Sequence, residues 1–426
     1  MLFFMKLLIY IAIMTTSFDI FLAWQMSGTV RFCQLVMFIP YAYLLWALKV
    51  RRIIIMPKAI GWLCFWNIFI LLFVLNTDEL VRSVGYWLWL TQDILNIILL
   101  VNVFVSTKQV KSLLRVYCLS FVMVAVFGLF QFIAAPFLKM NTPLVAQWWI
   151  PGVLARINGF SYEPSYFATY MLMGWCVLLV LLKYDNEVLF NRLKLRLMFC
   201  VVSASMILSS SRMGIMMMIC VVALPRFCKE IKEIILNFMK NKIHIKYIKC
   251  LLVVLVMCFC IGNIVPFDDL FDEYGFLLEG TGIGGTAAHS VDTRADNMEK
   301  TLVAFYDNPI IGSSLGGVAE KIAISNNQSG DTKDNEGSAV ALEVLAASGV
   351  VGIIPFLVYF YKLIKSSVES LVYDDGIGEG LLIALIAEIL ILQLNQNILR
   401  PYFWMHIAVL SVYLRWKKEE KSVFCK

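Results

Sequence analysis

Residues 116–135 read VYCLSFVMVAVFGLFQFIAA, twenty consecutive positions without a charged side chain. A stretch of about 20 apolar residues is long enough to cross the hydrocarbon core of a bilayer as one α-helix. Similar runs recur along the chain, so the sequence predicts an all-α polytopic membrane protein with about 12 transmembrane helices. The predicted spans are residues 3–24, 30–48, 59–76, 84–105, 116–135, 166–182, 195–210, 213–225, 247–265, 339–361, 380–397 and 402–415.

Two of these spans are less regular than the others. The first, within Met1 to Trp24, has a single lysine and no small-residue cleavage pattern, so we interpret it as a retained signal anchor. Residues 195–225 contain two short runs that meet at Ser209-Ser210-Ser211-Arg212. They predict either two short helices or one re-entrant pair.

The composition supports a membrane protein throughout. Of the 426 residues, 60% are hydrophobic and 15% are charged, against roughly 25% charged in soluble domains. The mean hydropathy is +0.79. We therefore treat residues 1–426 as a single integral membrane domain. The net charge of +6 does not indicate nucleic-acid binding, because basic residues in such a chain gather in cytoplasmic loops.

The distribution of basic residues predicts which loops lie on which side. With the N-terminus in the cytoplasm, the inner segments hold 26 of the 36 lysines and arginines and the outer segments hold ten. This bias predicts that both termini are cytoplasmic. Two outer segments are long: residues 136–165, and residues 266–338 between the ninth and tenth spans. The second carries thirteen acidic and four basic residues, and we expect it to form a small cap.

Arginines on the outer side suggest an anionic ligand. Arginine's planar fork matches phosphate and carboxylate better than lysine does. Arg212 follows three serines at a predicted helix N-terminus, where backbone N–H groups also favour an anion. Arg294 occupies the first turn of a loop helix that Thr293-x-x-Asp296 begins and Asn308-Pro309 ends. Alternatively, these arginines pair with neighbouring acids such as Asp292 or Asp296.

Residues 156–165, RINGFSYEPS, are the most informative segment for chemistry. Pro164 suits the first position of a helix, which places Glu163 at the helix end where its charge is favoured. A carboxylate there can accept a hydroxyl proton or orient an arginine. The simpler interpretation is a capping acid at a helix start.

The segment Arg156-x-x-Gly-Phe-x-x-Glu163-Pro-Ser resembles the signature of O-antigen and capsular polysaccharide polymerases of the Wzy type. Further motifs follow in the order found in that family, and the resemblance covers roughly residues 150–415. They are the serine-rich turn ending at Arg212, Arg294 with the large-loop motif Asn308-Pro-Ile-Ile-Gly312-Ser-Ser-Leu-Gly316, and the helix start Gly349-Val-Val-Gly352. The related O-antigen ligases carry a histidine where this chain has Ser338, and its absence favours a polymerase over a ligase.

The resemblance implies an enzyme of the bacterial cytoplasmic (inner) membrane that polymerises undecaprenyl-pyrophosphate-linked oligosaccharide units on the outer face. Arg156, Arg212 and Arg294 would clamp the pyrophosphate, and Glu163 would be the base or orienting acid, with Glu336 as a further catalytic candidate. Arg400 and Asn335 are additional candidates for substrate binding. The motifs imply no cofactor and no metal. The expected partners are the lipid bilayer and a chain-length regulator membrane protein, with no nucleic acid.

Two alternatives remain open from the sequence. A ligase-type transferase would use the same donor but pass the glycan to lipid A core. A lipid-linked oligosaccharide flippase or exporter would place its important polar groups within the membrane. Asp93, Glu388 and the cluster from Gln393 to Asn397 lie in or near predicted spans and keep the transporter alternative open.

Overall fold

The computed structural model describes most of the chain and omits the middle of it. The described residues are 2–25, 29–50, 53–77, 80–138, 145, 147–150, 152–184, 187–222, 298–325, 339–371, 376–395 and 398–424. The predicted span 247–265 and most of the predicted cap 266–338 therefore lie outside the described residues.

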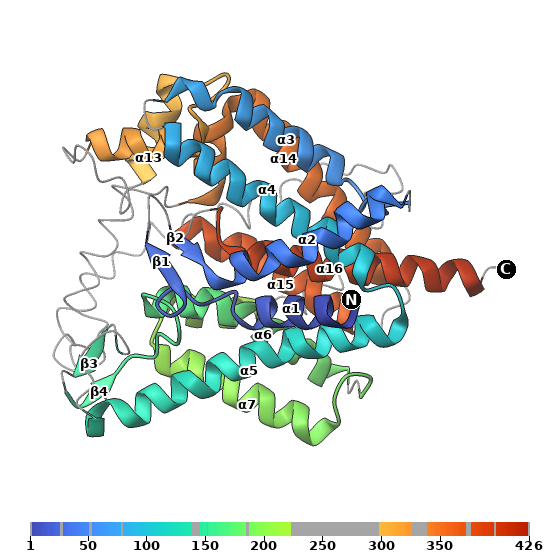
Figure 1. The fold of residues 1–426 in the computed structure, drawn as a ribbon. Coiled ribbons are helices and arrows are strands. Elements are labelled where there is room, and N and C mark those ends of the chain that lie inside the picture. The colour runs from blue at the N-terminus through green and yellow to red at the C-terminus, as the bar shows by residue number, and fades with distance from the viewer. Residues whose placement is uncertain are drawn as a thin grey trace, which may run out of the picture.

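The described chain is a bundle of helices with two small hairpins (Figure 1). Its longer elements are α1 (Leu2–Met14), α2 (Phe32–Lys49), α3 (Ile60–Leu72), α4 (Leu80–Val103), α5 (Thr107–Leu138), α6 (Pro164–Lys183), α7 (Arg192–Ser209), α13 (Ser314–Ser325), α14 (Val340–Ser370), α15 (Ile377–Asn395) and α16 (Pro401–Phe424). A helix also covers Arg212–Val222, another covers 298–307, and the 3-10 helix η1 spans Val74–Asn76.

Six helices within the described residues are long and apolar enough to cross a membrane, which confirms an all-α membrane protein. They are α2, α4, α5, α6, α14 and α15, and each coincides with a predicted span. The chain also contains two antiparallel pairs of very short strands. They are β1 (Ala23–Gln25) with β2 (Thr29–Arg31), and β3 (Trp148–Ile150) with β4 (Leu154–Ala155).

The prediction of one continuous first span over 3–24 is wrong. Helix α1 ends at Met14, and residues 23–25 form a strand. The hydroxyl of Thr15 donates to the carbonyl of Ile11, and that of Thr16 to the carbonyl of Ile13, so these side chains satisfy the last helical carbonyls. The backbone N–H groups of Asp19 and Ile20 then donate to the carbonyl of Phe160, which leads the chain out of the helix.

At 195–225 the structure contains two helices, α7 and the helix Arg212–Val222, as one of the two alternatives predicted. Helix α14 likewise contains a break, because Gly349 has a φ of 63° within it. This break agrees with the helix start expected at Gly349.

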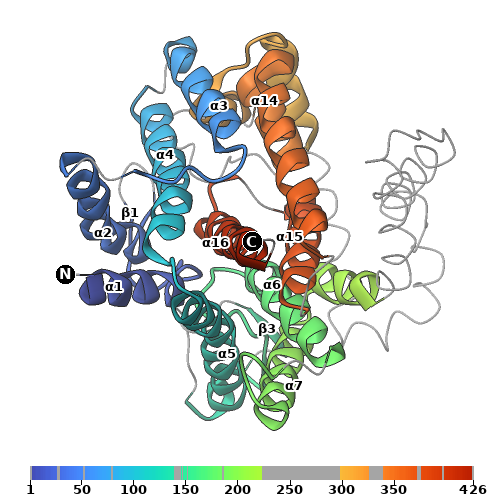
Figure 2. The same cartoon turned by 90° about the vertical axis from the view of Figure 1, so that its right-hand side faces the viewer.

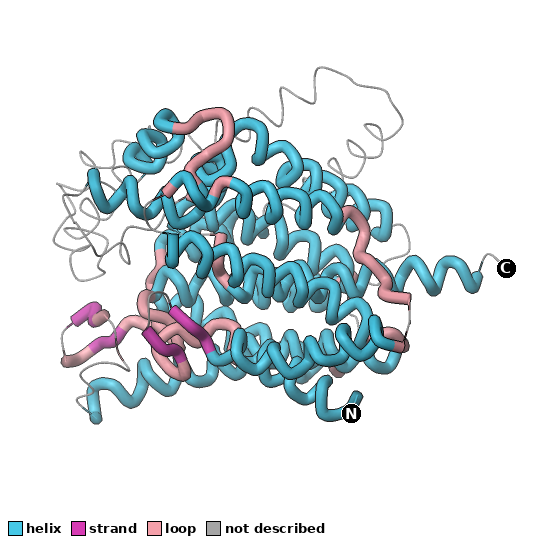
Figure 3. Tube along the Cα trace, turned by 45° about the horizontal axis from the view of Figure 1, so that its top comes forward, coloured by secondary structure: helices cyan, strands magenta, loops and turns pink. Residues whose placement is uncertain are grey.

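The two ends of the bundle differ in content. One end carries β1 to β4 and α13, and we call it the strand end (Figures 1 and 3). At the other end the indole N–H of Trp416 donates to the hydroxyl of Thr107, joining the later turns of α16 to the start of α5. Helix α16 lies in the middle of the ring formed by α4, α5, α6, α14 and α15 (Figure 2), and its residues 401–413 are all buried.

Candidate functional site

A turn of three serines connects α7 to the next helix at the strand end, and we call it the serine turn (Ser209–Ser211). Ser210 adopts a left-handed conformation with a φ of 54°. The hydroxyl of Ser211 accepts a hydrogen bond from the N–H of Gly214 at 3.4 Å, so Ser211 caps the helix that follows. Arg212 is the first residue of that helix, and its side chain is exposed. The predicted placement of Arg212 at a helix N-terminus is therefore confirmed.

Arg156 holds the serine turn from the side. Its Nε donates to the carbonyl of Ser209 at 3.2 Å and its Nη2 to the carbonyl of Ser210 at 3.0 Å. Its Nη1 donates to the side-chain oxygen of Gln147 at 2.6 Å. A guanidinium has five N–H donors, so these three bonds leave two for another acceptor.

Arg156 reaches this position because it directly follows β4. Its backbone N–H donates to the carbonyl of Gln147, which continues the pairing of β3 with β4. The next residues turn sharply at Gly159, which has a φ of 57°. The buried side chain of Gln131 clamps that turn by donating to the carbonyl of Gly159 at 2.9 Å and accepting from its N–H at 2.8 Å.

Glu163 lies at the N-cap position of α6, as predicted, but its side chain makes no capping hydrogen bond to the described backbone. It is the residue before the first helical turn, its backbone is extended, and Pro164 follows in the first turn. The hydroxyl of Ser165 donates to its carboxylate at 3.0 Å. The side chain of Glu163 is exposed, which leaves the carboxylate accessible from outside the bundle.

Arg156 lies close to Arg212 because it donates to the carbonyls of Ser209 and Ser210, and the charges of Arg212 and Glu163 both act on it. Burial and the positive charge of Arg212 lower the pKa of Arg156, and the negative charge of Glu163 opposes that change. The structure thus brings together Arg156, Glu163 and Arg212, which are separated by up to 56 positions in sequence. We call these residues the arginine–glutamate cluster. Two cations and one carboxylate give it a net positive charge.

Arg400, a predicted substrate-binding residue, lies in a second, buried cluster. Its Nη1 is 3.6 Å from the carboxylate of Asp19, and its guanidinium lies 4.3 Å from the centre of the Tyr166 ring. Arg31 approaches the same carboxylate from the other side at 2.7 Å. Arg400 and Asp19 are only 6% and 2% exposed. Arg400 therefore contacts protein groups here and does not face an open surface.

Sequence reasoning missed Asp19 and Tyr166 as members of this cluster. Asp19 is a lone acid in an otherwise apolar run, which was a usable signal. The prediction of a continuous span over 3–24 placed it within a helix. Tyr166 follows Glu163 by three positions, so it shares a helix face with the capping residue.

Two glycine motifs singled out in the sequence contact each other. The backbone N–H of Ser313 donates to the carbonyl of Ala346 at 3.0 Å, and that of Val350 donates to the carbonyl of Pro309 at 2.9 Å. Gly312 and Gly349 both have positive φ, and a Cβ on either would overlap the backbone of the other segment. The helix before Pro309 ends at residue 307, as the Asn308-Pro309 signal predicts.

Arg294, Asn335 and Glu336 lie outside the described residues, so their predicted roles stay predictions. Within the membrane-spanning part, Glu388 is fully buried on α15, and neither carboxylate oxygen has a hydrogen-bond partner among the residues that the structure describes. His406 on α16 hydrogen-bonds the hydroxyl of Tyr117 at 2.6 Å.

No family model matches the chain, and no curated protein matches it. The arginine–glutamate cluster must therefore be interpreted from its own chemistry. A net positive, accessible group at a helix N-terminus suits a phosphate or another anion. A carboxylate beside it can orient an arginine or accept a proton.

Proposed function

We propose that this chain is a Wzy-type polysaccharide polymerase. It transfers the growing glycan from polyprenyl pyrophosphate to a hydroxyl of another lipid-linked repeat unit. That hydroxyl oxygen forms a bond to the anomeric carbon, the bond between that carbon and the pyrophosphate oxygen breaks, and the hydroxyl proton is lost. The observation that carries the proposal is the arginine–glutamate cluster at the strand end of a membrane bundle.

Each member of the cluster has a distinct part in this proposal. Arg212 is exposed at a helix N-terminus, so it contacts the leaving pyrophosphate as negative charge develops there. Arg156 donates three hydrogen bonds to Gln147 and the serine turn, so it mainly fixes the position of Arg212. Glu163 orients the cation or accepts the hydroxyl proton.

The membrane arrangement belongs to the same proposal. The chain has about twelve spans, both termini lie in the cytoplasm, and the strand end faces outward from a bacterial cytoplasmic membrane. The segment 266–338 caps that outer end and contributes Arg294, Asn335 and Glu336. This arrangement is supported by the distribution of basic residues.

The experiment compares two exposed arginines, each of which is the first residue of a helix. Arg212 follows the cap Ser211 at the strand end, and Arg192 follows the cap Asn191 at the start of α7. Cells lacking the chain should display a surface glycan capped by one repeat unit. Arg212→Lys keeps the charge but loses the planar fork, so we expect it to lose about tenfold or more of polymerisation. Arg192→Lys should give normal ladders.

Glycan ladder length is measured beside the amount of protein in the membrane. Normal ladders from Arg212→Lys at normal abundance would contradict the pyrophosphate contact. Loss of every repeat unit in the deletion strain would favour the flippase or ligase alternatives, because both determine whether any unit reaches its acceptor. The buried Glu388 is the observation that favours a transporter as the second candidate.

A further inference from the structure

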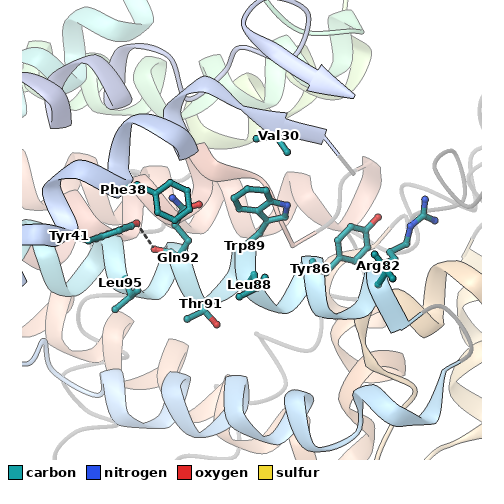
Figure 4. A pocket seen from close by; sticks show the side chains of 12 residues that line it. Val30, Phe38, Tyr41, Arg82, Tyr86, Leu88, Trp89, Thr91, Gln92 and Leu95 are labelled. Atoms are coloured by element: carbon teal, nitrogen blue, oxygen red, sulfur yellow. Dashed lines mark hydrogen bonds between the residues drawn. The ribbon is translucent and has the colours of Figure 1, made fainter. Parts of the chain in front are cut away.

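A groove lies between α2 and α4, away from the arginine–glutamate cluster. Its volume is about 400 Å³, which falls within the range of small-ligand sites, about 300–1,000 Å³. Its walls are largely apolar, and the aromatic residues Phe38, Tyr41, Tyr86 and Trp89 lie along its length (Figure 4). None of the described residues that line it is acidic.

The groove opens on an apolar outer face of the bundle. Phe38, Val81 and Leu88 line it and are 57%, 70% and 51% exposed. In a membrane-spanning bundle such apolar faces contact hydrocarbon chains. Along the groove the amide of Gln92 donates to the carbonyl of Gln34 at 2.6 Å. This bond ties α4 to α2.

One end of the groove carries Arg82, the one charged side chain among its described lining residues. Arg82 lies in the first turn of α4, ten residues before Gln92, or about 15 Å along the helix. Its Nη1 is buried and has no hydrogen-bond partner among the described residues. A cation at a helix N-terminus opposes the helix dipole, whereas an anion there is favoured by both the dipole and the guanidinium. The groove therefore combines an apolar channel with an arginine at its strand end.

We propose that this groove binds the prenyl chain of a second polyprenyl-pyrophosphate lipid, with the pyrophosphate at Arg82. This inference rests on the proposed function, in which one lipid-linked reactant loses its carrier and the other keeps it. The cluster of Arg156, Glu163 and Arg212 lies by α6 and α7, whereas α2 and α4 lie on another side of α16 (Figure 2). Two lipid-linked reactants thus have two separate sites, and the groove holds the acceptor.

The chain offers a matched pair of glycines for the test. A Cβ at Gly85, which lines the groove, meets no atom within 4 Å, and neither does a Cβ at Gly61 on α3. Gly85→Leu therefore adds a side chain in the groove with no clash at its Cβ, and Gly61→Leu adds the same side chain elsewhere. The full chain is purified into phosphatidylcholine nanodiscs, undecaprenyl phosphate is titrated in, and the bound lipids are counted by native mass spectrometry.

We expect wild type and Gly61→Leu to bind two undecaprenyl phosphates and Gly85→Leu to bind one. Arg82→Ala should weaken one of the two sites by about tenfold, as expected for loss of one charge-assisted hydrogen bond. Equal binding by Gly85→Leu and wild type would overturn the proposal. Displacement of the lipid by an equal concentration of phosphatidylglycerol would also overturn it, since the groove would then be a general phospholipid site.

Two further outcomes distinguish a failure of the proposed lipid groove from a failure of the proposed polymerase function. Asp78 and Glu79 precede Arg82 and lie outside the described residues. If Arg82 only pairs with one of them, Arg82→Ala lowers thermal stability while both lipids still bind, and the groove proposal fails. If the groove binds as expected but cells lacking the chain make full-length glycan, the polymerase function fails and the lipid site stands.

Discussion

Asp19 is a buried carboxylate that lies between two arginines. Arg31 is 2.7 Å from one of its oxygens and Arg400 is 3.6 Å from the other. Removing one member of a buried ion pair leaves an uncompensated charge, which costs far more than the pair itself contributes. This carboxylate should therefore matter for stability even though it lies outside the proposed reaction.

We expect Asp19→Asn to reduce the free energy of unfolding by about 3–5 kcal/mol, because two arginines would then share a buried site without a negative charge. The control is Glu369→Gln, the same change in an exposed pair with Lys58, 3.3 Å away. That change should cost at most about 1 kcal/mol. Thermal unfolding of the purified proteins in detergent compares them. Unfolding of Asp19→Asn at the wild-type temperature would refute this account.

The sequence predicted some of the site residues because their signals are local. Glu163 was recognisable as a helix cap from Pro164 beside it, and Arg212 from the three serines before it. The partners of Arg156 were not predictable in the same way. Ser209 and Ser210 are more than 50 positions away in sequence, and no local pattern reports a contact of that separation.

Among the elements, the contact between the segments around Gly312 and Gly349 fixes how the helix over 298–307 and α13 join α14. Both glycines have positive φ and both face backbone of the opposite segment. Any larger residue would need to adopt a disfavoured conformation and also push two backbones apart.

We expect Gly349→Ala to lower the free energy of unfolding by about 2–3 kcal/mol, since strain at positive φ adds to the overlap with the carbonyl of Ile310. Gly61→Ala is the matched control. Its Cβ meets open space within a helix, so alanine there should stabilise by about 0.5–1 kcal/mol. Detergent unfolding curves of both variants test the opposite signs. If both substitutions changed the stability in the same direction, the importance of the contact between the segments around Gly312 and Gly349 would be contradicted.

Hydropathy located most of the described helices but gave the wrong C-terminal end for the first helix. Six predicted spans coincide with six long apolar helices in the described residues. The run 3–24 failed because apolar composition does not distinguish a helix from an extended segment, and here Thr15 and Thr16 end α1 through side-chain hydrogen bonds. The short strands were not predicted, because strands of two or three residues have too little alternation to detect.

For the molecule as a whole, the orientation of the bundle in the membrane gives the most direct test of the proposed function. The hydroxyls of Ser83 and Ser314 are 3.0 Å apart at the strand end, and Thr107 and Trp416 meet at the opposite end. We expect reporter fusions after Lys108, Lys240 and Lys421 to lie in the cytoplasm, and fusions near Lys139 and Asn327 to lie outside. The side of the membrane on which each fusion lies is measured by alkaline phosphatase activity and green fluorescent protein fluorescence. A cytoplasmic signal at Asn327 would exclude the proposed reaction at the outer face.

The order of the helices around the bundle could not be predicted from the sequence. Basic residues assign loops to sides, but they do not say which helix lies at the centre. Helix α16 could have been suspected, because its first half lacks a polar face, yet several other helices share that property.

The central position of α16 has a consequence for biosynthesis. This helix leaves the ribosome after every other described helix, yet α4, α5, α14 and α15 all pack against it (Figure 2). Those helices enter the bilayer first, before the central helix is present. During that time polar groups such as Tyr117 lack their later partner His406. We therefore expect the partial bundle to be more exposed to membrane chaperones and quality-control proteases until α16 has inserted. Synonymous changes that slow translation of that last stretch should lower the yield of assembled protein without changing any contact in it.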